Sequence, residues 1–244
     1  MNFAATIATA TRVLRQLRHD PRTLGLLMVV PCVLMGLLAW VFKGTPTFDQ
    51  IGAPLLGIFP FVVMFLVTSV ATLRERTSGT LERLLTMPIG KLDFLVGYAL
   101  AFGLLAVAQA GLVSALSLVA FGLDVSGPVW LLVAIAVLDG LLGMALGLLV
   151  SAFAATEFQA VQFMPAIVLP QFLLCGLLVP RDEMPPVLRV ASDVLPLSYA
   201  VDAMRAVTAS NSVDAQTWVD LAIIAGCIGL ALGLGAATLR RRTA

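Results

Sequence analysis

The chain has 244 residues, of which 60% are hydrophobic and 12% are charged, and its mean hydropathy is +1.02. About a quarter of the residues in a soluble domain are charged, so this composition excludes a soluble domain and indicates an integral membrane protein. The formal net charge of +1 gives no sign of a nucleic-acid partner. Cys32, Cys175 and Cys227 lie in apolar stretches without metal-type spacing, so we expect packing residues and no metal site.

The first element is an amphipathic helix, expected within residues 1–20. Its apolar residues recur at helical spacing and its arginines lie outside that stripe, which is typical of a helix at a membrane interface. The stripe consists of Phe3, Ile7, Ala10, Leu14 and Leu17. Asp20 and Pro21 end this helix.

Six apolar segments follow, each long enough to cross a bilayer, and they predict an all-α integral membrane protein with six transmembrane helices in one domain. They cover about 24–42, 51–73, 94–121, 129–152, 158–179 and 221–239. Pro165 and Pro170 interrupt the fifth segment, so we expect a kinked helix that faces protein for much of its length. Small residues at four-residue spacing predict close helix packing within one chain. They are Gly143, Gly147, Gly229 and Gly233.

The basic residues predict the orientation. Eleven of the fifteen lysines and arginines lie before the first segment, in residues 74–93, or in the C-terminal tail. The other face carries Lys43, Arg181, Arg189 and Arg205. Because cytoplasmic loops are enriched in basic residues, both termini and residues 74–93 are expected in the cytoplasm.

Residues 74–93 form a polar loop between the second and third spans, and we expect a short amphipathic helix inside it. Residues 77–80 favour a helix start, and Pro88 ends the segment. Leu81, Leu84 and Leu85 form its apolar side, and Glu82 lies on the polar side. Three leucines cannot be buried within the loop itself, so the helix lies either in lipid headgroups or on a protein partner.

Residues 180–220 form the longest polar interval, and we expect it outside the cell with two short amphipathic helices separated at Pro196. The first has an apolar stripe of Val187, Val190, Ala191 and Val194. Ser198 is a candidate cap for the second, in which Asp202 and Arg205 can pair at i, i+3. We expect the apolar stripes to be buried against the outer ends of the fifth and sixth spans.

Asp139 is a charged residue inside the fourth span, about ten residues from either end. An ionised carboxylate at that depth costs about 2.5–3.5 kcal/mol on insertion scales, so the side chain should face the bundle or a wet cavity. We favour a structural hydrogen-bonding role over ion coupling. The neutral partners available to it are Gln109, Ser114, Ser117 and Gln162.

Enzymatic function is not expected. The pair Gly90 and Lys91 is followed by Leu92 and lacks the upstream glycine of a phosphate-binding loop, so the chain has no ATPase motif. The single histidine, His19, lies in the N-terminal helix, and no serine or cysteine has a plausible base near it.

Three stretches resemble one family. Residues 75–89 read Glu-Arg-Thr-Ser-Gly-Thr-Leu-Glu-Arg-Leu-Leu-Thr-Met-Pro-Ile and are followed by Lys91 and Gly97, which resembles the loop between the second and third spans of type-2 ABC exporter permeases. Residues 17–24 resemble the family's connecting helix and its entry to the first span. Residues 179–189 and 195–205 resemble its segment between the fifth and sixth spans, where short helices dip back toward the membrane.

The resemblance implies that the helix in residues 74–93 is a coupling helix, seated in a cleft of a separate ATPase subunit. That subunit would bind ATP and Mg, and this chain would bind no cofactor. The residues assigned to the contact are Glu75, Arg76, Gly79, Thr80, Leu81, Glu82, Leu84, Leu85 and Pro88.

The resemblance also implies a pair of permeases, either identical or sister chains, in the cytoplasmic membrane of a prokaryote. The branch resembled is drug and antibiotic export, such as the daunorubicin-type permeases. Export of a lipid or polysaccharide stays open, as does an ion-coupled carrier that uses Asp139. In an exporter, residues 180–211 would close the outer end of the path. The residues assigned to this external gate are Val190, Pro196, Tyr199, Asp202 and Arg205.

Overall fold

The computed structural model describes residues 3–78 and 91–238, and these ranges contain helices and no β-strand. The predicted all-α fold is confirmed. Most of the predicted coupling helix falls in residues 79–90, which lie outside the described residues.

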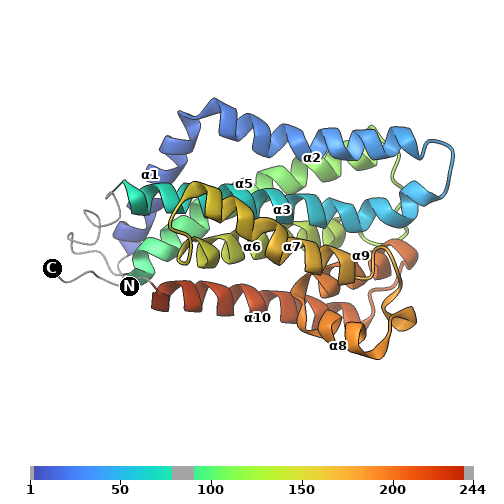
Figure 1. The fold of residues 1–244 in the computed structure, drawn as a ribbon. Helices are drawn as coiled ribbons and strands as arrows, with labels where there is room; N and C mark the ends of the chain where they lie inside the picture. The colour runs from blue at the N-terminus through green and yellow to red at the C-terminus, as the bar shows by residue number, and fades with distance from the viewer. Residues whose placement is uncertain (1–2, 79–90, 239–244) are drawn as a thin grey trace.

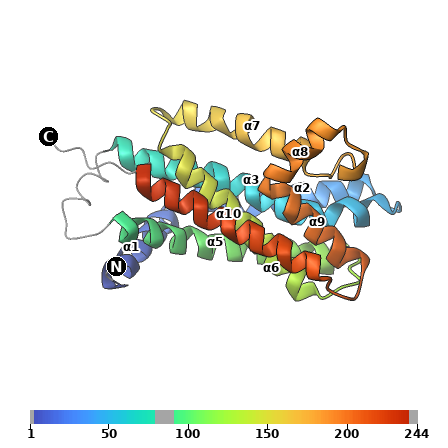
Figure 2. The ribbon, with the colours of Figure 1, turned by 90° about the horizontal axis from the view of Figure 1, so that it is seen from below.

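Long helices run side by side along the bundle, each antiparallel to the next in the chain (Figures 1 and 2). They are α2 (Pro21–Val41), α3 (Thr47–Thr77), α5 (Lys91–Val119), α6 (Val129–Ser151), α7 (Glu157–Leu174) and α10 (Ala215–Thr238). The shorter elements are α1 (Phe3–Arg18), η1 (Arg181–Glu183), α8 (Pro186–Val194) and α9 (Pro196–Ala209). Helix α1 lies at the end where α3 finishes and α5 begins, here called the terminal end. The elements η1, α8 and α9 lie at the opposite, distal end.

Helix α7 differs from the other long helices in its polarity. Helices α2, α3, α6 and α10, and α5 from Val96 onward, are long and apolar enough to cross a membrane. Helix α7 has only 18 residues and carries Gln159, Gln162 and Gln171, which lower its apolar character. The fifth predicted span is therefore not among the candidate spans identified by length and composition.

The backbone of α7 also departs from the sequence prediction. The helix is continuous through Pro165 and Pro170, and the kink expected at these prolines stays a prediction. It ends at Leu174 and not at Val179, because Gly176 has a φ of +90°, a left-handed conformation that commonly follows a helix end.

The centre of the bundle is the contact between α3 and α6, which depends on two glycines. A Cβ atom added at Gly143 would lie 2.1 Å from the carbonyl oxygen of Phe61, and one at Gly147 would lie 2.5 Å from that of Phe65. Any side chain there would push the two backbones apart. The predicted packing role of this pair within one chain is confirmed, whereas Cβ atoms at Gly229 and Gly233 would meet nothing within 4 Å in the described chain.

Helix α1 packs against α5 with a face that shares Ala10 and Leu17 with the predicted apolar stripe. Its buried residues are Thr6, Thr9, Ala10, Val13 and Leu17. Phe3 is 76% exposed and Ile7 is 43% exposed. A Cβ atom at Gly97 of α5 would lie 2.7 Å from the Cβ of Thr9, so the helices meet where both side chains are small. The helix is therefore turned so that its threonines, and not Phe3 and Ile7, face α5.

Helix α2 begins where Asp20 caps it. The Asp20 carboxylate accepts hydrogen bonds from the Thr23 hydroxyl at 2.6 Å and the Thr23 backbone N–H at 3.2 Å, and Pro21 occupies the first turn. These hydrogen bonds hold the pKa of Asp20 below its usual range.

All three tryptophans of the chain lie at the distal ends of long helices. Trp40 is in the last turn of α2, whereas Trp130 and Trp218 are in the first turns of α6 and α10. Their exposed fractions are 77%, 62% and 51%, so the indole rings project outward from the bundle.

Candidate functional site

Three consecutive residues in the last turn of α3, at the terminal end, each contact a different helix. Arg74 contacts α7, Glu75 contacts α1, and Arg76 contacts the last residue of α6. They directly precede residues 79–90, so the chain enters the predicted coupling segment from a point where four helices are joined. We call these three residues the α3 clamp.

The buried member of the α3 clamp is Glu75. Its two carboxylate oxygens each accept a hydrogen bond of 3.0 Å from the guanidinium of Arg12, and Glu75 is only 6% exposed. Arg12 also donates to the hydroxyl of Tyr98 on α5 at 2.9 Å and lies 5.8 Å from the centre of that ring. A bidentate arginine pair of this kind fixes orientation as well as charge, so α1, α3 and α5 are held in one arrangement.

The exposed member of the clamp is Arg74. Its Nε donates to Glu157 Oε1 at 2.8 Å and a terminal nitrogen donates to Oε2 at 3.1 Å. The two side chains are 57% and 50% exposed, and an exposed pair contributes only about 0–1 kcal/mol to stability. This contact joins the end of α3 to the first residue of α7.

The third member, Arg76, donates to the backbone carbonyl of Ser151. That carbonyl ends α6, where the last four carbonyls of a helix have no partner within the helix and carry partial negative charge. The Arg76 guanidinium therefore stabilises the end of α6 and ties it to α3.

The residues predicted to contact an ATPase subunit divide into two groups. Glu75 and Arg76 belong to α3 and contact helices of their own chain. The predicted helix start at residues 77–80 is wrong for its first two positions, because Thr77 ends α3 and Ser78 is its C-terminal cap. The second group lies outside the described residues and consists of Gly79, Thr80, Leu81, Glu82, Leu84, Leu85 and Pro88.

Asp139 lies in the core between α3, α6 and α9. It is fully buried, and a Cβ atom added at Gly57 would lie 2.9 Å from Asp139 Oδ2 and 2.7 Å from Met204 Cε. Within the described residues neither carboxylate oxygen has a hydrogen-bond partner. The hydrogen bonds expected for Asp139 are therefore not found among the described residues. Of the anticipated partners, Gln109 donates instead to the carbonyl of Leu27 at 2.7 Å.

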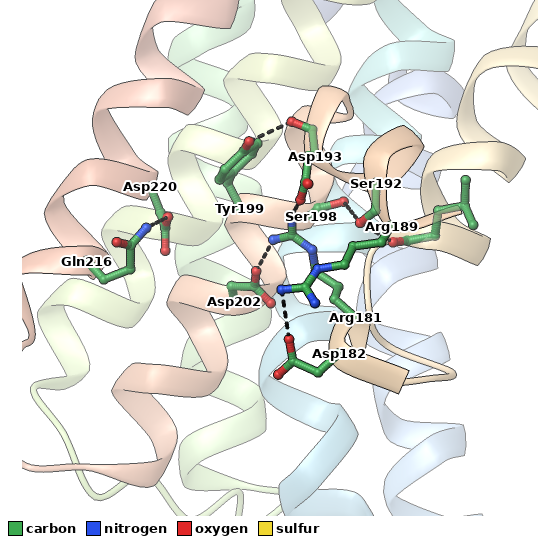
Figure 3. A network of polar contacts seen from close by, with 11 residues as sticks. Arg181, Asp182, Arg189, Ser192, Asp193, Ser198, Tyr199, Asp202, Gln216 and Asp220 are labelled. Carbon is green, nitrogen blue, oxygen red and sulfur yellow. Dashed lines mark hydrogen bonds and ion pairs between the residues drawn. The ribbon is translucent and has the colours of Figure 1, made fainter. Parts of the chain in front are cut away.

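At the distal end, Arg181 holds η1, α8 and α9 together (Figure 3). Its guanidinium forms ion pairs with Asp193 at the end of α8 and with Asp202 on α9. It also lies 5.4 Å from the ring centre of Tyr199, whose hydroxyl donates to the carbonyl of Asp193 at 2.6 Å. Burial raises the pKa of Asp202, while the adjacent Arg181 opposes that rise.

Two predicted interactions in this segment are replaced by others. Asp202 pairs with Arg181 and not with Arg205, which donates to the carbonyl of Leu177 at 3.3 Å. Ser198 does not cap α9, which starts with Leu195 at the cap position and Pro196 after it. Ser198 is buried, with its hydroxyl 3.0 Å from that of Ser192.

The two distal helices have opposite burial, and the prediction for the first is wrong. Val187, Val190 and Val194 of α8 are 80%, 65% and 76% exposed, so the expected burial of this stripe is not found in the chain. Helix α9 is buried instead, with its last turn held to the loop before α6. Ser126 N donates to the carbonyl of Thr208 at 3.2 Å, and Gly127 N donates to that of Val207 at 3.0 Å.

Four residues that the sequence interpretation did not assign to a site make the contacts described above. They are Arg12, Glu157, Arg181 and Asp193. In the sequence Arg12 and Arg181 contribute only to the charge count, and their partners lie between 12 and 86 residues away. Within the described residues no group of three or more His, Cys, Asp and Glu side chains could hold a metal ion.

The comparisons with known proteins agree with one another. A family model described as ABC-2 type transporter matches residues 4–208. The chain is 28% identical over 167 residues to a probable multidrug ABC transporter permease, YbhR, of Escherichia coli (strain K12), covering 68% of this chain and 45% of the relative. It is 25% identical over 182 residues to the permease YbhS of the same organism, covering 74% of this chain and 48% of the relative.

A third relative comes from another bacterium. The linearmycin resistance permease protein LnrN of Bacillus subtilis (strain 168) is 23% identical over 185 residues, covering 75% of this chain and 48% of the relative. The chain thus spans about half the length of the curated relatives it matches.

Proposed function

Because the chain belongs to the ABC-2 type transporter family, we propose that it is the membrane-spanning permease of an ATP-driven exporter of hydrophobic or amphiphilic, drug-like compounds. The printed names of YbhR, YbhS and LnrN, which refer to multidrug transport and to antibiotic resistance, support this class of substrate. Hydrolysis of ATP takes place in a separate ATPase subunit, which binds ATP and Mg, and a second permease copy or a sister chain completes the complex.

The observation that carries the proposal is the α3 clamp. Arg74, Glu75 and Arg76 join the entrance of the predicted coupling segment to α7, α1 and α6. A loop held in this way can pass a displacement to several helices at once, whereas a loop attached to one helix would bend locally. The terminal end is the cytoplasmic end, since it carries the excess of arginines and lysines.

In this arrangement α7 is the fifth of six spans. Gln159 and Gln162, which are exposed in the chain, need polar surroundings within a bilayer, and a second permease copy or a water-filled path supplies them. Helices η1, α8 and α9 then lie on the external side. The gate residues Tyr199 and Asp202 belong to the Arg181 network, which closes the outer end of the path.

The test begins with purification of the native complex through a tag on this chain, followed by identification of every subunit that co-purifies. An ATPase subunit is expected, together with ATP-dependent uptake of an amphiphilic dye into inside-out vesicles. Glu82→Arg, in the segment proposed to contact the ATPase, should release that subunit or uncouple it, because a reversed charge repels a complementary surface. Arg15→Glu on α1 is the control for a charge reversal elsewhere.

An ion-coupled carrier is the second candidate, favoured by the buried carboxylate of Asp139 without a hydrogen-bond partner in the described chain. The two classes give opposite results with a non-hydrolysable ATP analogue. Transport that continues with the analogue and follows an imposed proton gradient would replace the exporter proposal. Lipid and polysaccharide substrates are compared with dyes in the same vesicles.

A further inference from the structure

Helix α7, like α2, is only lightly embedded in its own chain. Its buried residues are Ala160, Val168 and Gln171, so most of its surface is free of contacts within the described protein. Its middle packs on the main core through Val168, with Met164 and Ile167 beside it, and its side-chain contacts with polar groups of other elements lie at its two ends.

The first end of α7 is attached to the last turns of α3. Leu73 of α3 forms a small apolar cluster with Ala154 and Ala160, separate from the main core, and Val70 and Phe163 pack against it. The bidentate pair between Arg74 and Glu157 lies beside this cluster. The end of α3 and the start of α7 are thus joined by an apolar contact and by an ion pair.

The other end of α7 is attached to the external segment. The carbonyl of Leu174, the last residue of the helix, accepts a hydrogen bond of 2.7 Å from the hydroxyl of Ser192 on α8. Ser192 is fully buried and also contacts Ser198 of α9. The turn at Gly176 then leads directly to Arg181, whose side chain packs 3.3 Å from the position of a Cβ atom at Gly176.

We propose that α7 transmits movement of the α3 clamp to η1 and α8, with Arg74 and Glu157 as the positioning residues at its input and the hydrogen bond from Ser192 to Leu174 at its output. The helix is unbroken through its prolines and about 27 Å long, so a shift at Glu157 reaches Leu174 without an intervening loop. The inference rests on the proposed function, because the α3 clamp moves in response to the ATPase subunit.

The exposed position of Arg74 and Glu157 is what makes the inference testable. A pair of this exposure contributes little to stability, so its loss should leave the chain folded and inserted. A bidentate pair nevertheless fixes direction, which is the property that a transmitting contact needs. The predicted defect is therefore one of coupling and not of folding.

The experiment compares Arg74→Glu, Glu157→Arg and the double variant that exchanges the two charges. In vesicles containing the native complex, each single variant should lower the amount of substrate moved per ATP hydrolysed by at least about fivefold, while the ATPase subunit still co-purifies. The exchanged pair should restore more than half of the wild-type ratio. Full recovery is not expected, because Asp20 also lies close enough to act on the charge at position 74.

A second measurement does not depend on transport. Amide hydrogen exchange in the purified permease should rise in α7 and in residues 181–194 of Arg74→Glu, and the exchanged pair should return it toward wild type. Helix α9, which is buried and held at Val207 and Thr208, should change little. Arg15→Glu is the matched control, since it reverses one exposed arginine of α1.

The outcomes separate this inference from the proposed function. Single variants that match wild type in both measurements would overturn the inference, as would defects that the exchanged pair does not rescue. In a third outcome, no ATPase subunit co-purifies with the wild-type protein, but hydrogen exchange still rises in Arg74→Glu and returns toward wild type in the exchanged pair. That result would refute the exporter proposal and support the connection through α7.

Discussion

The two ends of the molecule use arginine-centred ion pairs in different ways. At the terminal end, the pair between Arg12 and Glu75 spans 63 residues of sequence, and that between Arg74 and Glu157 spans 83. At the distal end, Arg181 reaches partners only 12 and 21 residues away. The terminal pairs exist only when the bundle is assembled, whereas the distal network lies within one continuous segment.

This difference shows which part of the chain can rearrange independently. Local networks can open with free energies far below that of global unfolding, whereas contacts between distant segments are lost together with the fold. At the distal end, the last turn of α9 is excluded from such movement because it is held to residues 126 and 127. The segment able to move is therefore η1 with α8, attached to α7 at one end and to α9 at the other.

Cysteine labelling should give the largest difference between the two ends, because each introduced cysteine either reacts with an impermeant reagent or does not. The result assigns each end to one side of the membrane. Ser212→Cys, in the exposed loop before α10, should react with an impermeant thiol reagent added to whole cells. Ser78→Cys, exposed at the end of α3, should react only after the cells are opened. Labelling of Ser78→Cys in intact cells would reverse the assignment of the two ends.

Arg12→Ala should cause the largest loss of stability at the terminal end. It leaves the carboxylate of Glu75, which is 6% exposed, without its counter-charge. Removing one partner of a fully buried pair costs about 3–5 kcal/mol, and the 31% exposure of the Arg12 side chain places the expected loss below that range. The thermal midpoint and the monodisperse yield of detergent-purified protein measure this loss. The double variant Arg12→Met with Glu75→Met, which leaves no unpaired charge, should recover most of the stability. Equal losses in both variants would show that the pair itself is not what holds α1.

Arg181→Met should have a smaller and local effect. Amide exchange in residues 181–199 should increase while the long helices stay protected. A lower thermal midpoint for unfolding of the whole protein would contradict the conclusion that the Arg181 network is local.

The same variant should also make the distal segment sensitive to pH. Burial already raises the pKa of Asp202, and the variant removes the arginine that opposes this rise. A carboxyl group with a raised pKa stabilises the folded form below its unfolded pKa, and that stabilisation is lost as pH rises through the folded pKa. Protection of residues 196–202, corrected for intrinsic exchange, should therefore fall with rising pH more steeply than in wild type.

Asp139→Asn should have the smallest effect on folding, because the substitution keeps the side-chain shape and breaks no hydrogen bond in the described structure. Folded yield should match wild type, and ATP-driven export should persist. A normal folded yield with export abolished would show that export requires an ionisable group at position 139, in the centre of the bundle.

Much of the fold was predictable from the sequence, because apolar length alone locates the long helices. Hydropathy placed α6 to within one residue at its end, and Asp20 with Pro21 marked the boundary between α1 and α2. Charge counting could not find the partner of Arg12 or Arg74, since these contacts depend on how distant helices are rotated. The spacing of apolar residues on α1 similarly favoured Phe3 and Ile7, while the close approach at Gly97 selects Thr6 and Thr9.

The distal helices illustrate a second limit. The spacing of the α8 valines predicts burial because an apolar stripe usually faces a core, but the short helix presents them outward. The i, i+3 spacing of Asp202 and Arg205 predicted a local pair, and Arg181 competes for the same carboxylate from another element. Sequence spacing shows which residues can contact each other within one helix, but it does not predict contacts with residues of other elements.

The tryptophans at the distal end have a consequence for how the protein sits in lipid. Indole rings prefer the headgroup region, so Trp40, Trp130 and Trp218 fix the depth of the distal end at one leaflet. With all three tryptophans there, a thicker or thinner bilayer is accommodated mainly at the terminal end. The turns of α3 that carry Arg74 to Arg76 would then move relative to the lipid surface as bilayer thickness changes, and membrane composition would set how far they project into the water.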